Sequence, residues 1–325
     1  MKINKYKRSA EITINLQILA LKKLKKIIGK SFNQAVKAIG DCNSKCILVG
    51  VGKSGHLANL IAASLSSVGA SSFALQSASD AAHGDLGAIS TSPKKKDILI
   101  LISNSGSSSE LNTIISYAKK HNIKLIGITS KKKSTLYKAA NIKILIPEVK
   151  EAGIGGIVPS SSLIAQTALG SALVIAVMQY KKHGIKVFRK FHPGGTLSKK
   201  LLEVQDIMVK TPFVSENCKM KKALKILSQK KLGLLVAKNN KGSTKGLLVD
   251  GDVKRANQKF KNLHDLKVKD IMTKNPLSVP QNMLAVQSLS IMNNKRITSL
   301  LIHKNKNKNK TIGIVHIHNV LQKIG

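Results

Sequence analysis

Residues 46–56 read CILVGVGKSGH and combine an apolar run, a glycine-rich turn and the start of a helix. Outward from this stretch, the chain continues as short apolar runs separated by segments with helical spacing. Strands that are apolar on both faces and alternate with helices are typical of a parallel sheet covered on both sides. We therefore predict an α/β domain whose five-stranded parallel sheet is flanked by helices. The expected strands span 46–51, 72–76, 97–103, 124–130 and 142–147, and the expected helices span 55–68, 108–121 and 133–140.

The sequence on either side of this domain has a different organisation. Residues 9–40 show the apolar spacing of one or two helices, and residues 204–238 are echoed by residues 268–304. Each copy of this repeat continues into a strand and a helix, which predicts tandem β-α-β-β-α units. The expected divisions are an N-terminal helical segment (1–44), the α/β domain (45–192), a linker (193–203) and two repeats (204–262 and 268–325).

The chain is strongly basic, with 55 Lys+Arg against 15 Asp+Glu and a formal charge of +40. Only four of the basic residues are arginine, tryptophan is absent, and aromatic residues make up 3% of the chain. Specific readers of nucleic acid rely on arginine forks or aromatic platforms. Because the lysines are also spread along the whole sequence, we expect no specific nucleic-acid partner.

One segment has the apolar character of a membrane span, since residues 152–180 contain no charged residue. Its first part is broken by glycines, Pro159 and a run of serines, so a helix buried between protein layers fits better than a bilayer span. The three cysteines, Cys42, Cys46 and Cys218, form neither a metal-type set nor an even disulfide framework. The basic N-terminus lacks the apolar core of a signal peptide. We therefore expect a cytoplasmic protein without a membrane partner.

The first loop after a strand, Gly50 to His56, matches the dinucleotide pattern G-x-G-x-x-G by letter. A dinucleotide site also needs an acidic residue at the end of the second strand, where this chain has Leu75 and Gln76. A P-loop fails as well, because its first glycine would fall at Ile47. What remains is a glycine turn with Lys53 at a helix start, which suits a phosphate or a sugar hydroxyl.

The second loop, residues 103–110, reads SNSGSSSE and opens a helix after an apolar strand. Hydroxyl groups and backbone N–H groups at a helix N-terminus make a compact phosphate site. The alternative is ordinary helix capping, with Ser107 and Glu110 forming a capping box. One capping pair does not explain five serines in seven positions, so the loop favours phosphate binding.

Three further residues leave two interpretations open. His83 and His192 stand in turn-like contexts, where each histidine taken alone is more often a hydrogen-bonded surface or core residue than an acid or base. Glu151 is the last charged residue before the neutral segment. It is either a base with a raised pKa at the mouth of a buried helix, or the solvated end of a lysine-rich stretch. Composition alone does not decide between these interpretations.

Six motifs, GVGKSGH, AAHGDLG, ISNSGSSSE, VKEAG, PSSS and FHPGGTLSKKLL, precede the repeated unit. Together they resemble the arabinose 5-phosphate isomerase family, in which a sugar-isomerase (SIS) domain is followed by two CBS domains. The resemblance implies the interconversion of D-ribulose 5-phosphate and D-arabinose 5-phosphate through a cis-enediol, which supplies the Kdo sugar of lipopolysaccharide or capsule. It also implies a homotetramer whose active sites combine residues from more than one chain.

The resemblance assigns roles to residues of this chain. Glu151 is expected to be the C–H base, and His192 or His83 the acid or base at the substrate oxygens. Lys53 would bind hydroxyls or stabilise the enediolate, and Glu110 would orient Lys53 or the sugar, or act as the base instead. The catalytic set is thus Lys53, Glu110, Glu151 and His192, and the substrate-binding set is Ser54, His83, Ser103, Ser105 and Ser108. The reaction requires no cofactor.

Several positions depart from the family pattern. Residues 76–80 read QSASD where the family has an H-P-x-E segment associated with an inhibitory metal, so we expect no metal. In the CBS pair, Val249 and Asn319 replace a common Thr and Asp, which weakens the expectation of a nucleotide or CMP-Kdo ligand there. The alternative functions are a non-catalytic sugar-phosphate sensor and an isomerase of another phosphosugar. Sensors of this type usually carry an N-terminal helix-turn-helix, for which residues 1–44 are too short.

Overall fold

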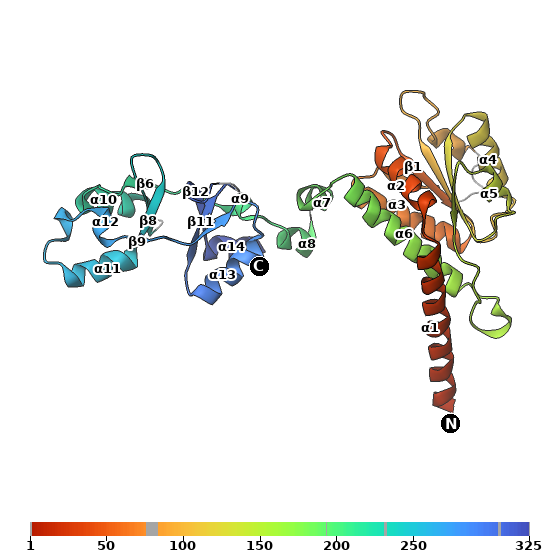
Figure 1. Cartoon of the computed structure of the whole chain (residues 1–325), viewed down its shortest axis with the longest axis horizontal. Coiled ribbons are helices and arrows are strands. Elements are labelled where there is room, and N and C mark those ends of the chain that lie inside the picture. The colour runs from red at the N-terminus through yellow and green to blue at the C-terminus, as the bar shows by residue number, and fades with distance from the viewer. Residues whose placement is uncertain (1, 76–83, 193, 231–232, 305–306, 325) are drawn as a thin grey trace. The chain divides into compact units, whose positions relative to one another are not determined.

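The computed structural model describes residues 2–75, 84–192, 194–230, 233–304 and 307–324 of the chain (Figure 1). Contacts divide the chain into two compact units, Met1–Phe191 and His192–Gly325. Each unit has buried hydrophobic clusters of its own.

The first unit is built around a five-stranded sheet in the order β2-β1-β3-β4-β5, with every neighbouring pair parallel. The strands are β1 (Cys46–Gly50), β2 (Ser72–Ala74), β3 (Ile98–Ile102), β4 (Lys124–Thr129) and β5 (Ile142–Leu145). This confirms the predicted parallel α/β sheet, although each strand is one or two residues shorter than its apolar run. Polar residues at the ends of the runs, such as Ser103, therefore lie in the loops.

Helices cover both faces of this sheet because alternate strand residues point to opposite sides. On one face Leu48 and Ile100 pack with α2, α3 and α6, and on the other face Ile47 and Leu99 pack with α4 and α5. The helices of the unit are α1 (Lys2–Ile27), α2 (Lys30–Asp41), α3 (Lys53–Ser67), α4 (Leu111–Lys120), α5 (Thr135–Ala139), α6 (Ser161–Tyr180) and α7 (Ile185–Phe191), with short 3-10 turns at Asp85–Ala88 and Ile154–Gly156.

Helix α6 is the neutral segment that the sequence marks out. Among the described helices, it alone is long and apolar enough to cross a membrane, and half of its apolar window is buried inside the protein. It contacts α1, α2 and α3, and Leu169, Leu173 and Val177 join the core on that face of the sheet. The structure thus gives this helix the protein partners that the serine- and glycine-rich sequence predicts.

The second unit contains the predicted repeat. In each copy a parallel strand pair leads into an antiparallel pair: β6 (Phe213–Ser215), β7 (Leu234–Lys238) and β8 (Thr244–Val249), then β10 (Ser278–Pro280), β11 (Ser299–His303) and β12 (Thr311–His316). The antiparallel pairs share an irregularity at equivalent places, between Ala237 and Lys238 and between Ile302 and His303. Residues of both sheets, including Val236 and Leu301, form one buried cluster between the copies.

The remaining elements of this unit are helices and one short strand. They are α8 (Gly195–Lys200), α9 (Val204–Ile207), α10 (Met220–Lys230), α11 (Asp250–Lys259), a 3-10 turn (Leu263–Asp265), α12 (Val268–Ile271), β9 (Thr273–Lys274), α13 (Ala285–Lys295) and α14 (Ile317–Ile324).

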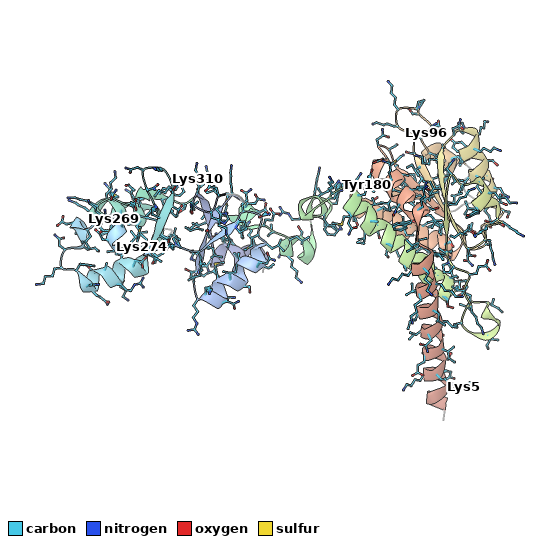
Figure 2. The ribbon with its side chains drawn as sticks, viewed as in Figure 1. Lys5, Lys96, Tyr180, Lys269, Lys274 and Lys310 are labelled. Carbon is cyan, nitrogen blue, oxygen red and sulfur yellow. The ribbon has the colours of Figure 1, made fainter. Side chains whose placement is uncertain are left out.

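Lysine side chains are distributed over both units. Of those labelled in Figure 2, Lys5 and Lys96 belong to the first unit, and Lys269, Lys274 and Lys310 belong to the second. The high positive charge is therefore a property of the whole chain and is not concentrated on one element.

Candidate active site

The strand order of the first unit places a topological switch point between β1 and β3. These strands are neighbours, but α3 leads from β1 to β2 on one face and α4 leads from β3 to β4 on the other. Ligands of open parallel sheets bind where the connections diverge in this way, beyond the carboxyl ends of the strands. The turn that leads to Lys53 follows β1, and residues 103–110, called the serine loop below, follow β3, so both lie at this switch point.

The loop after β1 makes a tight turn into α3. A Cβ atom at Gly50 would lie 2.4 Å from the backbone of Ser54, so only glycine allows this approach of the helix to the strand. Lys53 is the first residue of α3 and is exposed. Ser54 Oγ lies 3.2 Å from Oε1 of the buried Gln166 and donates to it, which links the start of α3 to α6.

The serine loop brings together the three hydroxyls predicted to hold phosphate. Ser103 Oγ lies 3.5 Å from Ser105 Oγ and 3.4 Å from Ser108 Oγ, and it accepts the backbone N–H of Gly106 at 3.0 Å. Ser103 is buried, whereas Ser105 is exposed and Ser108 is half-buried. The loop therefore presents hydroxyls on a buried anchor, just ahead of a helix N-terminus.

The capping-box alternative for this loop is wrong. Helix α4 begins at Leu111, three residues later than predicted, and Glu110 occupies the N-cap position without a side-chain capping bond. Glu110 is exposed and instead accepts a hydrogen bond from Ser109 Oγ at 3.3 Å. The serines between β3 and α4 thus lie outside the helix, and the hydroxyl of Ser107 is not used to cap it.

The end of β4 and the residues after it hold the serine loop in place, which the sequence patterns did not reveal. The backbone N–H and Oγ of Ser130 both donate to the carbonyl of Asn104, at 3.0 and 2.8 Å, and Thr129 Oγ1 donates to the same oxygen at 3.1 Å. The backbone N–H of Leu136 donates to the carbonyl of Gly106 at 2.9 Å. Position alone could have identified Thr129 and Ser130, because they end the run of β4 at the same edge of the sheet.

Gly106 is expected to be intolerant of a side chain. Its φ is +64°, and a Cβ atom would lie 2.3 Å from Ser134 Oγ and 2.5 Å from Thr129 Oγ1. We expect Gly106→Ala to destabilise the protein by about 1–3 kcal/mol, which would lower the melting temperature by several degrees. Gly184→Ala is the matched control, because nothing lies within 4 Å of its Cβ position. Equal thermal unfolding of the two variants would contradict the tight packing of the serine loop.

Glu151 caps the N-terminus of α6. Its Oε2 accepts hydrogen bonds from the backbone N–H of Ser160 (2.8 Å), from Ser160 Oγ (3.0 Å) and from the backbone N–H of Ser161 (2.7 Å). The N–H of Ser162 is shared between the two carboxylate oxygens, 3.3 Å from each. Oε2 is therefore anchored, whereas Oε1 keeps its lone pairs largely available.

Of the two interpretations left open for Glu151, the one with a raised pKa is wrong. Burial is the largest single influence and raises the pKa, but the hydrogen bonds from Ser162 and Ser160 together outweigh it and leave the pKa below its ordinary value. The carboxylate of Glu151 is thus ionised near neutral pH, as a general base must be.

Neither predicted histidine belongs to the described part of the first unit. His192 is half-buried and begins the second unit, and His83 lies outside the described residues. Their roles remain predictions from the resemblance. Within the described ranges, no group of three His, Cys, Asp or Glu side chains is arranged to hold a metal ion.

A separate cavity of about 590 Å³ lies between the two repeats of the second unit. Val249 and His316, which end equivalent strands, both line it, together with Arg296. Burial, and then the nearby His318, lower the pKa of His316. Asp252 beside this cavity is buried and already engaged, because it bonds Arg255, Thr273 Oγ1 (3.1 Å) and the N–H of Val249 (3.0 Å).

Comparisons with known proteins identify the families to which the two units belong. Residues 39–176 match the SIS domain family, and residues 204–259 and 268–325 match the CBS domain family. The chain is 35% identical to arabinose 5-phosphate isomerase KdsD of Yersinia pestis over 321 residues, covering 98% of this chain and 95% of the relative. It is 31% identical to the Escherichia coli K12 protein of the same name, over 98% of this chain and 95% of that protein.

A solved structure, that of the E. coli CFT073 protein c3406 in complex with arabinose 5-phosphate, is also similar to this chain. It is 30% identical with a TM-score of 0.54, and the match covers 59% of this chain and 100% of that one. The SIS and CBS models match the two units of the chain, and named isomerases match 98% of its length. This chain belongs to the arabinose 5-phosphate isomerase family.

Proposed function

We propose that this chain interconverts D-ribulose 5-phosphate and D-arabinose 5-phosphate, and that the product feeds Kdo and lipopolysaccharide biosynthesis. The observation that carries the proposal is the cluster of Ser103, Ser105 and Ser108 hydroxyls. It lies after β3, at the point where the connections from β1 and β3 lead to opposite faces of the sheet. A cluster of hydroxyls at a helix N-terminus suits a phosphate dianion. Near full-length similarity to named isomerases supports arabinose 5-phosphate as the sugar phosphate.

In the proposed mechanism, the serine loop binds the phosphate and fixes the sugar relative to the acidic side chains. Oε1 of Glu151 removes the proton from the carbon beside the carbonyl and returns it to the neighbouring carbon, so that one carboxylate serves both directions. The ammonium of Lys53 stabilises negative charge on the enediol oxygens, where a positioned cation acts most strongly in the transition state. His192 or His83 moves the proton between these oxygens.

Glu110 is the alternative base. It is exposed and accepts a hydrogen bond from Ser109, whereas Glu151 is held by several donors at the N-terminus of α6. Its place at the start of α4, directly after the serine loop, suits a group that orients Lys53 or a sugar hydroxyl. We therefore assign the proton transfer at carbon to Glu151.

The reaction is tested by following arabinose 5-phosphate formation from ribulose 5-phosphate with the purified full-length chain. Turnover without added metal or cofactor is the expected result. Turnover only with a heptose or hexose phosphate would assign another phosphosugar. Thermal stabilisation by sugar phosphates without any turnover would assign the sensor function.

We further propose that the chain forms a homotetramer in the cytoplasm. Helix α1 carries exposed apolar residues at helical spacing (Ile14, Ile18 and Leu21), Ile28 is exposed just beyond its end, and Ile175 of α6 is exposed as well. Exposed apolar patches of this kind usually mark protein contacts. The mass in solution, measured by light scattering, is expected to be four times that of one chain, and a monomeric mass would contradict the proposal.

For the CBS pair we propose a nucleotide or CMP-Kdo as the ligand of the cavity between the repeats. Its volume of about 590 Å³ lies in the usual range for small-molecule sites, and Arg296 supplies a cation for a phosphate group. A thermal-shift series with AMP, ATP and CMP-Kdo tests this. A flat response would leave the pair a structural role.

A further inference from the structure

A buried glutamine of α6 contacts the start of α3, next to Lys53. Gln166 is 3% exposed and lies on the buried face of α6 together with Leu169 and Leu173. Its Oε1 accepts a hydrogen bond from Ser54 Oγ at 3.2 Å. A buried amide among apolar side chains is costly unless it is hydrogen-bonded. The contact with Ser54 therefore explains how the core accommodates Gln166.

The turn that leads from β1 into α3 is held through Ser54. Gly52 in this turn has a φ of +56°, and no atom of the described residues lies within 4 Å of its Cβ position, so the turn is not packed on that side. The backbone of Ser54 lies against Gly50 of the strand, and its side chain is bonded to Gln166. Lys53 is exposed, and its place is set by these two contacts of the next residue.

The same part of α6 also holds Glu151. Ser162 lies one helical turn before Gln166, and its backbone N–H lies 3.3 Å from both carboxylate oxygens of Glu151, to which it donates. A continuous line of contacts thus leads from Glu151, through the first turns of α6 and the side chain of Gln166, to Ser54 beside Lys53.

A second contact fixes how α3 and α6 pack. A Cβ atom at Gly170 would overlap Ile61 Cδ1, so the two helices touch there. Gly170 lies one turn after Gln166, and Ile61 lies two turns after Ser54. Because the helices are also joined at Ser54 and Gln166, the start of α3 cannot move relative to α6 without breaking that hydrogen bond.

We propose that Gln166 is a positioning residue, which holds the ammonium of Lys53 at the required place relative to the carboxylate of Glu151. The proposal rests on the proposed isomerase function, in which Lys53 stabilises negative charge on the enediol oxygens. This charge develops in the transition state, so the placement of Lys53 acts on kcat more than on KM. The hydroxyl of Ser54 then serves the geometry of the protein, in place of the substrate contact that the resemblance implies for it.

Gln166→Met is the central substitution, because methionine has a similar shape and offers Ser54 only a weak acceptor. With ribulose 5-phosphate, kcat is expected to fall about tenfold and KM to stay within about twofold of the original value. Inhibition by inorganic phosphate should be unchanged, since the serine loop is intact. A kcat within about twofold of the original, or a loss of kcat/KM that lies entirely in KM, would overturn the proposal.

Ser54→Ala removes the other half of the contact. If Gln166 acts through Ser54, then Ser54→Ala, Gln166→Met and the double variant all lose kcat by a similar factor, because the second substitution has nothing left to remove. If Ser54 binds the sugar directly, Ser54→Ala lowers kcat/KM by the same factor whether residue 166 is glutamine or methionine. That additive result would overturn the proposal.

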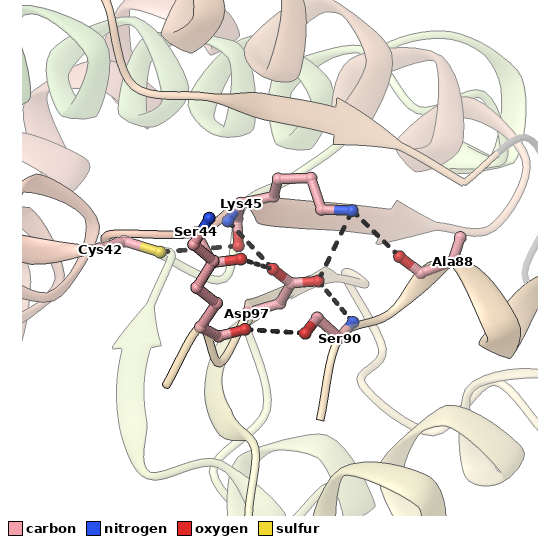
Figure 3. Close-up of polar contacts among 7 residues, drawn as sticks. Cys42, Ser44, Lys45, Ala88, Ser90 and Asp97 are labelled. Atoms are coloured by element: carbon pink, nitrogen blue, oxygen red, sulfur yellow. Dashed lines mark hydrogen bonds and ion pairs between the residues drawn. The ribbon is translucent and has the colours of Figure 1, made fainter. Parts of the chain in front are cut away.

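Ser44→Ala is the matched control for general destabilisation. Ser44 Oγ donates to the buried carboxylate of Asp97 at 2.5 Å, at the opposite end of β1 (Figure 3). Asp97 keeps the backbone N–H groups of Lys45 (3.0 Å) and Ser90 (2.7 Å) as donors. Because a hydrogen bond to a charged group contributes more than a neutral one, the melting temperature should fall at least as far as in Gln166→Met, while kcat stays near its original value. A kcat that falls in step with the melting temperature in both variants would overturn the proposal.

Hydrogen exchange tests the positioning without the reaction. The backbone N–H groups of Gly55 and His56 donate to the carbonyl of Gly52 at 2.9 and 3.3 Å, so they report on the first turn of α3. Both should exchange about fivefold faster in Gln166→Met than in the unsubstituted chain, and Ser44→Ala should leave them unchanged. Unchanged exchange in Gln166→Met would overturn the positioning, whereas an unsubstituted chain that does not turn over ribulose 5-phosphate would overturn the isomerase function.

Discussion

Glu151→Gln is expected to lower kcat for ribulose 5-phosphate by about 10³-fold and to change KM by no more than about threefold. Glutamine has nearly the same shape, and its carbonyl oxygen can still accept the backbone N–H groups of Ser160 and Ser161 that Glu151 Oε2 accepts. The substitution therefore removes basicity while it keeps the cap of α6. A steady-state assay in both directions measures the loss, which should be equal because the same carboxylate serves both.

Glu148→Gln is the matched control for this experiment. Glu148 lies three residues earlier, is exposed and pairs with Lys131 at 2.6 Å, so its removal is expected to leave kcat and KM near their original values. Glu110→Gln tests the competing assignment. If Glu110→Gln abolishes turnover while Glu151→Gln stays within about tenfold of the original enzyme, the base is Glu110.

Glu151→Gln also has an expected effect on the stability of the protein in acid. The folded protein lowers the pKa of Glu151, so the ionised side chain stabilises the fold above its ordinary pKa of 4.5, and this contribution disappears as the pH falls through the lowered value. Glu151→Gln lacks the contribution at every pH. The difference in melting temperature between the two proteins should therefore be largest near neutrality and should shrink below about pH 4.5. A constant difference would contradict the lowered pKa.

The parallel sheet could be predicted because its strands are continuous apolar runs between glycine- and serine-rich loops. The start of α4 could not be predicted, since the residues before Leu111 also satisfy the sequence pattern of a capping box. Only the folded chain shows that Ser103 Oγ accepts the N–H of Gly106 and that the next turns stay outside the helix. Hydroxyl-rich loops offer several competing local hydrogen bonds, and tertiary contacts choose among them.

The lowered pKa of Glu151 could not be predicted from the sequence for a related reason. Its proximity to a buried helix suggested desolvation, which raises a carboxyl pKa, but the opposing donors come from residues nine to eleven positions later. Which effect wins depends on the turn at 152–160 bringing Ser160 back to the carboxylate. The position of Thr129 and Ser130 at the end of β4 could have identified these two residues. Their partner could not be predicted, because it is the backbone carbonyl of Asn104, which carries no signal in the residue type.

The double substitution Ser105→Ala and Ser108→Ala is expected to lower kcat/KM for ribulose 5-phosphate by about 10²-fold, mainly through KM. Each hydroxyl would donate to a phosphate dianion, and a hydrogen bond to a charged group contributes about 1.5–3 kcal/mol, with incomplete additivity for neighbouring donors. Ser103 is left in place because its Oγ accepts the N–H of Gly106, so replacing it would disturb the loop itself.

Two further measurements distinguish phosphate binding from general damage to the loop. Ser107→Ala, at an exposed position between the two replaced serines, should retain nearly full activity. D-ribulose without its phosphate should be a poor substrate for every variant, with nearly the same kcat/KM, because it has no group for the hydroxyls to bind. Competitive inhibition by inorganic phosphate should weaken in the double variant by a factor comparable to the rise in KM. If the activity with unphosphorylated ribulose falls as steeply as that with ribulose 5-phosphate, the serine hydroxyls act on the shape of the loop and do not hold the phosphate.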